Sequence, residues 1–382
     1  MKTALITGTR APAALDLARL FAAAGWRVIG ADSLRFPVGR WSRALERHYH
    51  LLPAKADHHA YAAQLAAIIR DEGVDLLIPT CEEVFFIARH RDALSRLCRV
   101  ACPDFTTLAR LHDKTALAAA ATGLGIAVPE TIRVEDRDGL YRALGHLGRN
   151  VVLKPAFSRF ACRTLIRPEA PAVARVCPSA SDPWAVQRFV PGREVCTYAI
   201  AQAGRLTAFA AYEPRHRVGT GASILFQPVN EPEAEAFAAG FARRHALDGQ
   251  FAFDLIHSPA QGWSVIECNP RATSGIHLFR PGDGLPDAFA GNGRHQPGDS
   301  CGRMVGLAML LFGLPRAAMT GCLTEAWRDW RQAEDVMARP GDPWPAVTQG
   351  LALAEGLVRA VRLGCSPLAA TTADLEWNGE TL

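Results

Sequence analysis

Two acidic residues and an asparagine in the second half of the chain have the types and spacing of a divalent-metal site. The side chains of residues 251–257 alternate between two faces, and residues 263–268 form a return strand after the four-residue turn 259–262, which predicts a β-hairpin. In the register that this turn sets, Asp254 lies directly across from Glu267, and Asn269 lies on the same face as Glu267. Opposed carboxylates destabilise a sheet unless a cation lies between them.

Oxygen ligands of this kind suit Mg²⁺, which keeps coordination positions open for water and for substrate phosphates. We therefore predict a magnesium site on this face of the hairpin. The alternative is a pair of solvated acids on an exposed sheet face. The register also places Ala252 opposite Asn269. The other face is expected to be core, and its predicted members are Phe251, Phe253, Leu255, Ile266 and Cys268.

Lysine is rare in this chain. Of 42 basic residues only Lys2, Lys55, Lys114 and Lys154 are lysines, so arginine has replaced lysine nearly everywhere else. Lysine is a compact point charge that binds phosphate where the planar fork of arginine does not fit. We therefore expect Lys114 and Lys154 to contact a nucleotide.

Length and composition restrict the class of protein. A chain of 382 residues with 49% hydrophobic and 21% charged residues is typical of a soluble globular protein of two to four domains. The net charge of +4 is small and dispersed, which argues against nucleic acid as a partner. No apolar run approaches the roughly 20 residues that span a bilayer, and no signal peptide is visible. We expect a cytoplasmic protein without a membrane partner, whose ten cysteines are reduced.

The first hundred residues predict an αβ domain. Strands at 2–7 and 27–31 flank a helix at 13–24, and a further strand at 75–79 is followed by Glu82 and Glu83. The first turn lacks the GxGxxG pattern, so we do not expect a dinucleotide there. Ligands of open α/β sheets lie at the carboxyl ends of strands. The two glutamates therefore either face a substrate or act as dipole partners at a helix start.

The middle of the chain adds a helix at 106–123, a strand at 150–155 ending near Lys154, and a strand near 184–190. A loop with two arginines, Arg159 and Arg163, follows Lys154. A basic, glycine-rich loop spans 215–223, and its Arg215, His216 and Arg217 either grip an anionic substrate or form a solvated surface. Helices are expected at 303–314 and 345–363.

Taken in order, Lys114, Lys154, the segment 187–194 and the run Glu267-Cys268-Asn269-Pro270-Arg271, with Asp254 upstream, resemble the ATP-grasp ligases. The likeness covers about residues 1–280 and is strongest to stand-alone members, similar to carbamoyl-phosphate synthase, that join a carboxylate to an amine. It implies a multidomain α/β fold with an N-terminal Rossmann-like domain (1–105), a lid (106–186), a central antiparallel-sheet domain (187–285) and a helical C-terminal extension (286–382).

The resemblance also implies roles for residues. Lys114 and Lys154 would contact ATP phosphates, Lys154 and Arg271 would be catalytic, and Glu194 would hold the ribose. Mg²⁺, expected as two ions, would bind Asp254, Glu267 and Asn269. The remaining candidates are Gln187, Phe189 and Val190 as the hinge against adenine, Arg159 and Arg163 toward phosphates, and Glu82, Glu83, Arg215, His216, Arg217, Ser274 and His277 toward the substrate.

One feature departs from the family, because the loop after Lys154 contains no glycine where many members have a glycine-rich loop over the phosphates. The resemblance implies that a carboxylate is activated as an acyl phosphate, with ADP released, and is then attacked by an amine. A thiol or bicarbonate as co-substrate, and a non-catalytic ATP-binding regulator, stay open as alternatives. Small molecules are the expected partners, and a homodimer is compatible with the resemblance.

Overall fold

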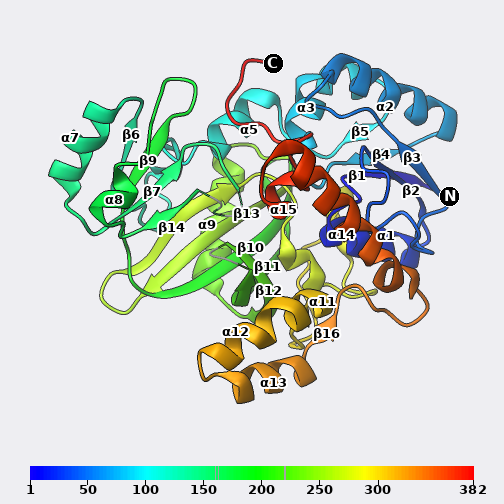
Figure 1. The fold of residues 1–382 in the computed structure, drawn as a ribbon. Helices are drawn as coiled ribbons and strands as arrows, with labels where there is room; N and C mark the ends of the chain where they lie inside the picture. The colour runs from blue at the N-terminus through cyan, green and yellow to red at the C-terminus, as the bar shows by residue number, and fades with distance from the viewer. Residues whose placement is uncertain (160, 162, 219–220) are drawn as a thin grey trace.

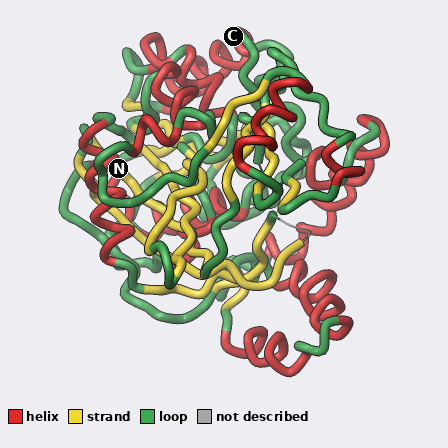
Figure 2. The backbone as a smooth tube through the Cα atoms, turned by 90° about the vertical axis from the view of Figure 1, so that its left-hand side faces the viewer, coloured by secondary structure: helices red, strands yellow, loops and turns green. Residues whose placement is uncertain are grey.

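The structure is a computed structural model, and it describes residues 1–159, 161, 163–218 and 221–382. The chain forms three sheets that follow one another in sequence (Figure 1). Strands lie inside and helices lie around them, as the view turned by 90° also shows (Figure 2). No helix among the described residues is long and apolar enough to cross a membrane.

The N-terminal domain is built on a five-stranded parallel sheet in the order β3-β2-β1-β4-β5. Parallel strands require crossover helices, and both faces of the sheet are therefore covered. The elements are β1 (Thr3–Thr7), α1 (Pro12–Ala23), β2 (Arg27–Asp32), β3 (Arg47–His50), α2 (His58–Glu72), β4 (Leu76–Ile78), α3 (Glu83–Arg89), α4 (Arg91–Leu94) and β5 (Arg99–Val100).

Two short helices, α5 (Phe105–His112) and α6 (Leu117–Ala121), lead to the lid, which has its own core of aliphatic residues and one tryptophan. The lid sheet has four strands in the order β6-β9-β7-β8, all antiparallel to their neighbours. Its elements are β6 (Thr131–Val134), α7 (Arg137–Leu147), β7 (Val151–Pro155), β8 (Leu165–Ile166), α8 (Ala170–Val173) and β9 (Trp184–Arg188).

The central sheet has seven strands in the order β14-β13-β10-β11-β12-β15-β16. One face packs against α9 and α6, and the other shares a core with α1 of the N-terminal domain. The elements are β10 (Arg193–Gln202), β11 (Arg205–Val218), β12 (Ala222–Val229), α9 (Pro232–Arg244), β13 (Gly249–Ser258), β14 (Gly262–Asn269), the 3-10 helix η1 (Ser274–Leu278), α10 (Leu285–Ala290) and β15 (Arg303–Met304).

The C-terminal region crosses back over the other domains. A helical hairpin of α12 and α13 protrudes from the bottom of the body (Figures 1 and 2). Helix α14 runs across the N-terminal domain beside α1 (Figure 1). The elements are α11 (Gly306–Ala308), the π-helical turn η2 (Met309–Gly313), α12 (Leu314–Met319), α13 (Leu323–Gln332), β16 (Glu334–Asp335), α14 (Trp344–Leu363) and α15 (Pro367–Ala370).

Three elements differ from the sequence-based expectation. The predicted helix 106–123 is two helices, the predicted helix 303–314 begins as strand β15, and the expected basic loop 215–223 is mostly the hairpin β11–β12. Gly219 and Thr220, within that hairpin, lie outside the described residues. The region expected as a helical extension also contributes β15 and β16 to the central sheet.

Candidate active site

The hairpin β13–β14 places Asp254 directly opposite Glu267, and Ala252 opposite Asn269, as the sequence predicts. The route to this register is different. Ser258 pairs with Gly262, so the turn is one residue shorter than predicted, and a β-bulge between the turn and Asp254 restores the register. A bulge inserts one extra residue into one strand and re-aims the side chains beyond it.

The bulge corrects one predicted core position. Leu255 pairs with Val265 while Asp254 pairs with Glu267, so Ile266 is the inserted residue. Val265 rather than Ile266 therefore packs in the core beneath the hairpin. Ile266 is half-buried, and its carbonyl oxygen accepts a hydrogen bond from Lys154 Nζ at 2.9 Å.

The two acids form a half-buried, crowded carboxylate pair. Burial raises the pKa of Asp254, and the neighbouring charges of Glu267 and Glu194 raise it further. Asn269 lies beside them, with its Nδ2 at 3.4 Å from Asp254 Oδ2. Crowded carboxylates that disfavour their own ionisation are stabilised by a bound cation. The oxygen donors of this cluster therefore fit a hard divalent ion.

Both predicted lysines reach this face of the hairpin from separate segments. Lys154 extends from β7 and is buried, and burial lowers its pKa to about 8, although Glu267 opposes the shift. Lys114 is also buried, with its Nζ at 3.5 Å from Glu267 Oε1 and at 2.7 Å from the Ser158 carbonyl oxygen. Two point charges thus lie beside the carboxylates, where they could neutralise phosphate oxygens.

Lys114 reaches the site because the predicted long helix breaks at Asp113. Asp113 has an extended backbone, and its Oδ1 accepts hydrogen bonds from Thr115 N and Oγ1 at 2.8 and 2.6 Å. The Lys114 amide donates to the Ala156 carbonyl oxygen at 3.1 Å. An aspartate that bonds its own backbone two residues on competes with the helix, so this turn aims Lys114 at the hairpin.

Arg271 and Glu82 connect the hairpin to the N-terminal domain. Arg271 Nη2 lies 3.3 Å from Asn269 Oδ1, and its Nε lies 3.9 Å from Glu82 Oε1. Glu82 is buried, its Oε2 pairs with Arg159, and its Oε1 has no hydrogen-bond partner among the described residues. A buried carboxylate oxygen without a donor is costly, which makes Glu82 a candidate contact for a ligand.

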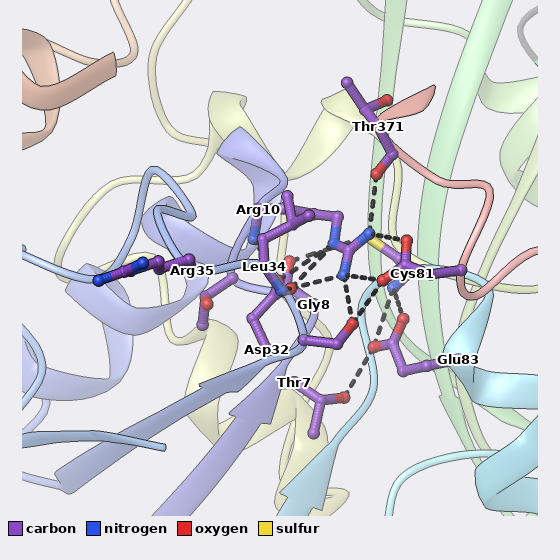
Figure 3. Close-up of polar contacts among 12 residues, drawn as sticks. Thr7, Gly8, Arg10, Asp32, Leu34, Arg35, Cys81, Glu83 and Thr371 are labelled. Atoms are coloured by element: carbon purple, nitrogen blue, oxygen red, sulfur yellow. Dashed lines mark hydrogen bonds and ion pairs between the residues drawn. The ribbon is translucent and has the colours of Figure 1, made fainter. Parts of the chain in front are cut away.

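Glu83 points in a different direction from Glu82. Its carboxylate accepts hydrogen bonds from Thr7 Oγ1 at 2.7 Å and from the amides of Thr80 and Cys81 (Figure 3). It ties the loop after β4 to the end of β1. Of the two alternatives left open for this glutamate pair, the structure favours a structural role for Glu83 and a site-facing position for Glu82.

The predicted hinge lies between the lid and central sheets. Gln187 lies in β9 and donates to Thr131 Oγ1 at 2.9 Å, and Phe189 and Val190 belong to the segment that connects β9 to β10. Glu194 follows at the start of β10 and forms an ion pair of 2.6 Å with Arg217. Strand β10 runs beside the strand that carries Asp254, because Glu194 pairs with Ile256 and Cys196 pairs with Asp254.

Several predicted site residues are not brought to this cluster. Arg215 and His216 contact Asp329 of α13 at 3.3 and 2.9 Å, and His216 has a positive φ of 48°. They hold the C-terminal hairpin and leave Arg217 as the site-facing member of the triplet. Arg163 pairs with Asp182 within the lid at 2.6 Å. The neighbouring Phe160 and Cys162 lie outside the described residues.

His277 is also away from the cluster. It is buried, its Nδ1 lies 2.8 Å from Asp16 Oδ2, and its ring stacks on Phe226. It therefore belongs to the contact between α1 and the central sheet. This position corrects the prediction that His277 faces the substrate. Ser274, at the start of η1, is half-buried.

Sequence reasoning missed two groups of residues. Arg10 pairs with Asp32 at 2.6 Å and with Asp374 at 2.7 Å (Figure 3 shows the Arg10–Asp32 contact). The carboxylate of Asp32, at the end of β2, is therefore bound by an arginine of the same chain. His58, His59 and His90 gather on the surface although 32 positions separate the first from the last. The charge of Arg89 beside them opposes a cation, and we leave this group out of the candidate site.

Comparison with known proteins gives a likeness in structure only. No protein-family model and no curated protein sequence matches the chain. N5-carboxyaminoimidazole synthetase from Staphylococcus aureus complexed with ADP aligns with a TM-score of 0.63 and 14% identity, covering 84% of this chain and 86% of that one. The chain has the ATP-grasp fold.

Two further structures with the ATP-grasp fold are similar to this chain. An L-amino acid ligase from Bacillus licheniformis has a TM-score of 0.54 and 15% identity, over 73% of this chain and 68% of that one. The biotin carboxylase domain of Hydrogenobacter thermophilus 2-oxoglutarate carboxylase, in complex with MgADP and bicarbonate, has a TM-score of 0.60 and 11% identity, over 76% and 70%. At these identities the shared property is the fold.

Proposed function

We propose that this protein is an ATP-dependent, ADP-forming ligase that activates a carboxylate and couples it to an amine. The observation that carries the proposal is the half-buried pair of Asp254 and Glu267, held face to face beside the buried Lys114 and Lys154 and beside Arg271. The fold adds support, because two of the similar structures hold ADP.

Mg²⁺ is the ion that the acid pair fits, and Asp254, Glu267 and Asn269 would hold it, with two ions expected. The bound ions supply charge neutralisation at the terminal phosphates of ATP. Lys114 and Lys154 would contact the same phosphates from the lid side. Their burial strengthens each contact, because an ion pair is worth more where water is excluded.

The hinge residues would position the nucleoside. Gln187, Phe189 and Val190 would lie against adenine through their backbone groups, and Glu194 would hold the ribose hydroxyls. Glu194 is paired with Arg217 in this structure. Its carboxylate would therefore contact the ribose and Arg217 at the same time. Arg217 keeps a proposed role near the substrate as well.

The chemistry would run in two steps. A carboxylate oxygen attacks the γ-phosphorus and ADP leaves, which gives an acyl phosphate; the amine nitrogen then attacks the acyl carbon, loses a proton and expels phosphate. Arg271 would stabilise the oxyanion of the second step. Glu82, whose Oε1 accepts no hydrogen bond from the described residues, would face the substrate. Because phosphoryl transfer needs little covalent help, positioning would carry most of the rate.

Bicarbonate is a second candidate for the activated carboxylate. One observation favours it, namely that the biotin carboxylase structure similar to this chain contains bicarbonate together with MgADP. The phosphate-side residues would act in the same way with either acid. The two candidates differ in the product, since a bicarbonate reaction gives a carboxylated amine rather than an amide.

The experiment that tests the proposal is a panel of carboxylates and amines, with bicarbonate included, scored by nucleotide products and product mass. We expect ADP and orthophosphate that appear only with an acceptor pair, and a hydroxamate when hydroxylamine replaces the amine. AMP and pyrophosphate as products would contradict the proposal. A protein that binds ATP without turnover on any pair would favour the regulatory alternative.

A further inference from the structure

The last twelve residues, 371–382, form a tail that packs on the N-terminal domain and reaches Glu82 and Arg159 of the candidate site. Asp374 anchors this tail to the N-terminal domain. Its carboxylate receives hydrogen bonds from Arg10 and from Ser33 Oγ, and it pairs with Arg359 at 2.8 Å. Burial alone would raise its pKa, but these donors hold the pKa of Asp374 at about 2. The segment is thus fixed to the N-terminal domain by a charged contact that stays intact at neutral pH.

Arg10 makes this anchor specific. Its guanidinium lies between Asp32 and Asp374, and its Nη1 also donates to the Thr371 carbonyl oxygen at 2.8 Å (Figure 3). The side chains of Arg10 and Asp32 are 5% and 0% exposed. When one of the two carboxylates beside a buried arginine is removed, part of the arginine's charge is left without a partner, which is destabilising. The tail therefore completes the carboxyl end of the N-terminal sheet.

Beyond the anchor, Trp377 enters an aromatic cluster formed by three parts of the chain. Its ring stacks on Phe85 of α3 at 4.9 Å between centroids and packs edge-on against Phe105 of α5 and Phe157. Phe157 belongs to the loop after Lys154. Trp377 thus joins the N-terminal domain to the loop that follows Lys154.

Glu376 makes the second contact with that loop. Its carboxylate pairs with Arg159 Nη2, while Arg159 Nη1 pairs with Glu82. The Trp377 amide lies 3.4 Å from Glu82 Oε2. The side chains of Arg159 and Glu82 are 9% and 3% exposed, so water screens these charges little. Arg159 is therefore fixed between a site glutamate and a tail glutamate.

The close approach of Gly379 shows how tightly the tail covers the loop. A Cβ at Gly379 would lie 2.7 Å from the ring of Phe157, and the residue has a φ of +93° that favours glycine. The glycine is in the tail, whereas the loop itself has none. The tail packs on the loop where the family resemblance leads one to expect a glycine-rich segment.

We propose that Glu376 and Trp377 are positioning residues of the candidate site, which hold Phe157 and Arg159 against Glu82 so that residues 157–159 are ordered before nucleotide binds. The inference rests on the proposed function for its consequence in nucleotide binding. Preorganised loops bind ligands more tightly, because the ordering cost is already met in the free protein.

Hydrogen exchange of the full-length protein without nucleotide tests the positioning role directly. We expect Glu376→Gln and Trp377→Ala to raise amide exchange in peptides that contain Phe157 and Arg159 by about tenfold or more, with lid helix α7 unchanged. Trp377→Phe should restore much of the protection. Glu380→Gln is the matched control, because it removes the same charge from the same segment, but the carboxylate partners are Lys55 and the Asn378 amide and not the loop, and glutamine can still accept from that amide.

The proposal is overturned if either Glu376→Gln or Trp377→Ala leaves the loop at wild-type exchange, or if Glu380→Gln raises it equally. A second arm measures MgADP binding by calorimetry, and both variants should weaken it by about fivefold. If the loop loosens and wild-type protein binds no MgADP, the positioning role stands and the proposed function fails. If the loop loosens while MgADP affinity is unchanged, positioning for nucleotide is overturned.

Discussion

At the scale of residues, the site depends on charges that are crowded together. Burial and the charges of Glu267 and Glu194 raise the pKa of Asp254, and the buried Lys114 and Lys154 lie beside this acid cluster. Burial of unlike charges seldom adds stability by itself. We infer that this cluster serves to bind ligands, in which Mg²⁺ neutralises the carboxylates and nucleotide phosphates neutralise the lysines.

A lysine substitution tests that inference. Lys154→Met keeps about the same side-chain length and removes the charge. We expect MgADP affinity measured by calorimetry to fall by about tenfold or more, because one charge-assisted contact with a phosphate is lost. Lys2→Met is the control, since Lys2 lies over the Trp26 ring at the N-terminus. Equal affinities for the two variants would remove Lys154 from the phosphate site.

Residue-scale predictions of position are confirmed where local periodicity decides the outcome, because strand alternation placed Asp254 and Glu267 opposite each other. Lys114 and Lys154, singled out by the scarcity of lysine, both contact the hairpin, and their contact with nucleotide stays a prediction. Alternation could not separate Glu82 from Glu83 or place His277. Their partners come from distant segments, as the pairing of His277 with Asp16 across 261 positions shows.

At the scale of elements, two irregularities put side chains in place. The bulge at Ile266 offsets a short turn, and the break at Asp113 stops a helix that composition alone would continue to Gly123. Neither is visible in hydrophobic periodicity. A bulge shifts the alternation of side chains by one residue. The helix break depends on a hydrogen bond from the Lys114 amide to Ala156, which directly follows β7.

The helix break gives a prediction with an internal control. Asp113→Ala removes the acceptor for Thr115 and the partner of Arg133 at 2.9 Å, so Lys114 loses its fixed direction. We expect MgADP affinity to fall by about threefold to tenfold, with a stability loss of about 1 kcal/mol.

The control for that variant is Asp104→Ala. Asp104 caps the other end of the same helix, accepting from the Thr107 amide at 2.9 Å. Its removal should lower the free energy of unfolding by a similar amount, about 1 kcal/mol, and leave the affinity unchanged. If both variants weaken MgADP binding alike, the effect is general destabilisation and the break has no directing role.

At the scale of the whole molecule, the N-terminal and central domains share one core, so the site between them is held by packing as well as by charge. Helix α1 packs on η1 and α10, and buried residues of both domains form a single cluster. Asp16 and His277 pair inside this contact, and Arg19 and Arg339 place further charge beside Asp16. Hydrogen bonding to His277 and the nearby cations lower the pKa of Asp16 against the effect of burial.

Removal of His277 tests its reassigned role. His277→Ala leaves a buried carboxylate with one partner fewer, and we expect the free energy of unfolding in urea to fall by about 3 kcal/mol. MgADP affinity below the unfolding transition should not change, because the ring does not reach the acid pair. A variant of wild-type stability with impaired substrate binding would return His277 to the substrate site.

The central claim is that the β13–β14 hairpin binds Mg²⁺ together with a nucleotide. Calorimetric titration of ADP with and without Mg²⁺ tests it most directly, in wild-type protein, in Glu267→Gln and in Glu213→Gln, an acid of the same sheet that pairs with Arg193. We expect Mg²⁺-dependent binding that Glu213→Gln retains and Glu267→Gln weakens by about thirtyfold or more, roughly 2 kcal/mol. Wild-type, Mg²⁺-dependent affinity in the Glu267→Gln variant would contradict the account.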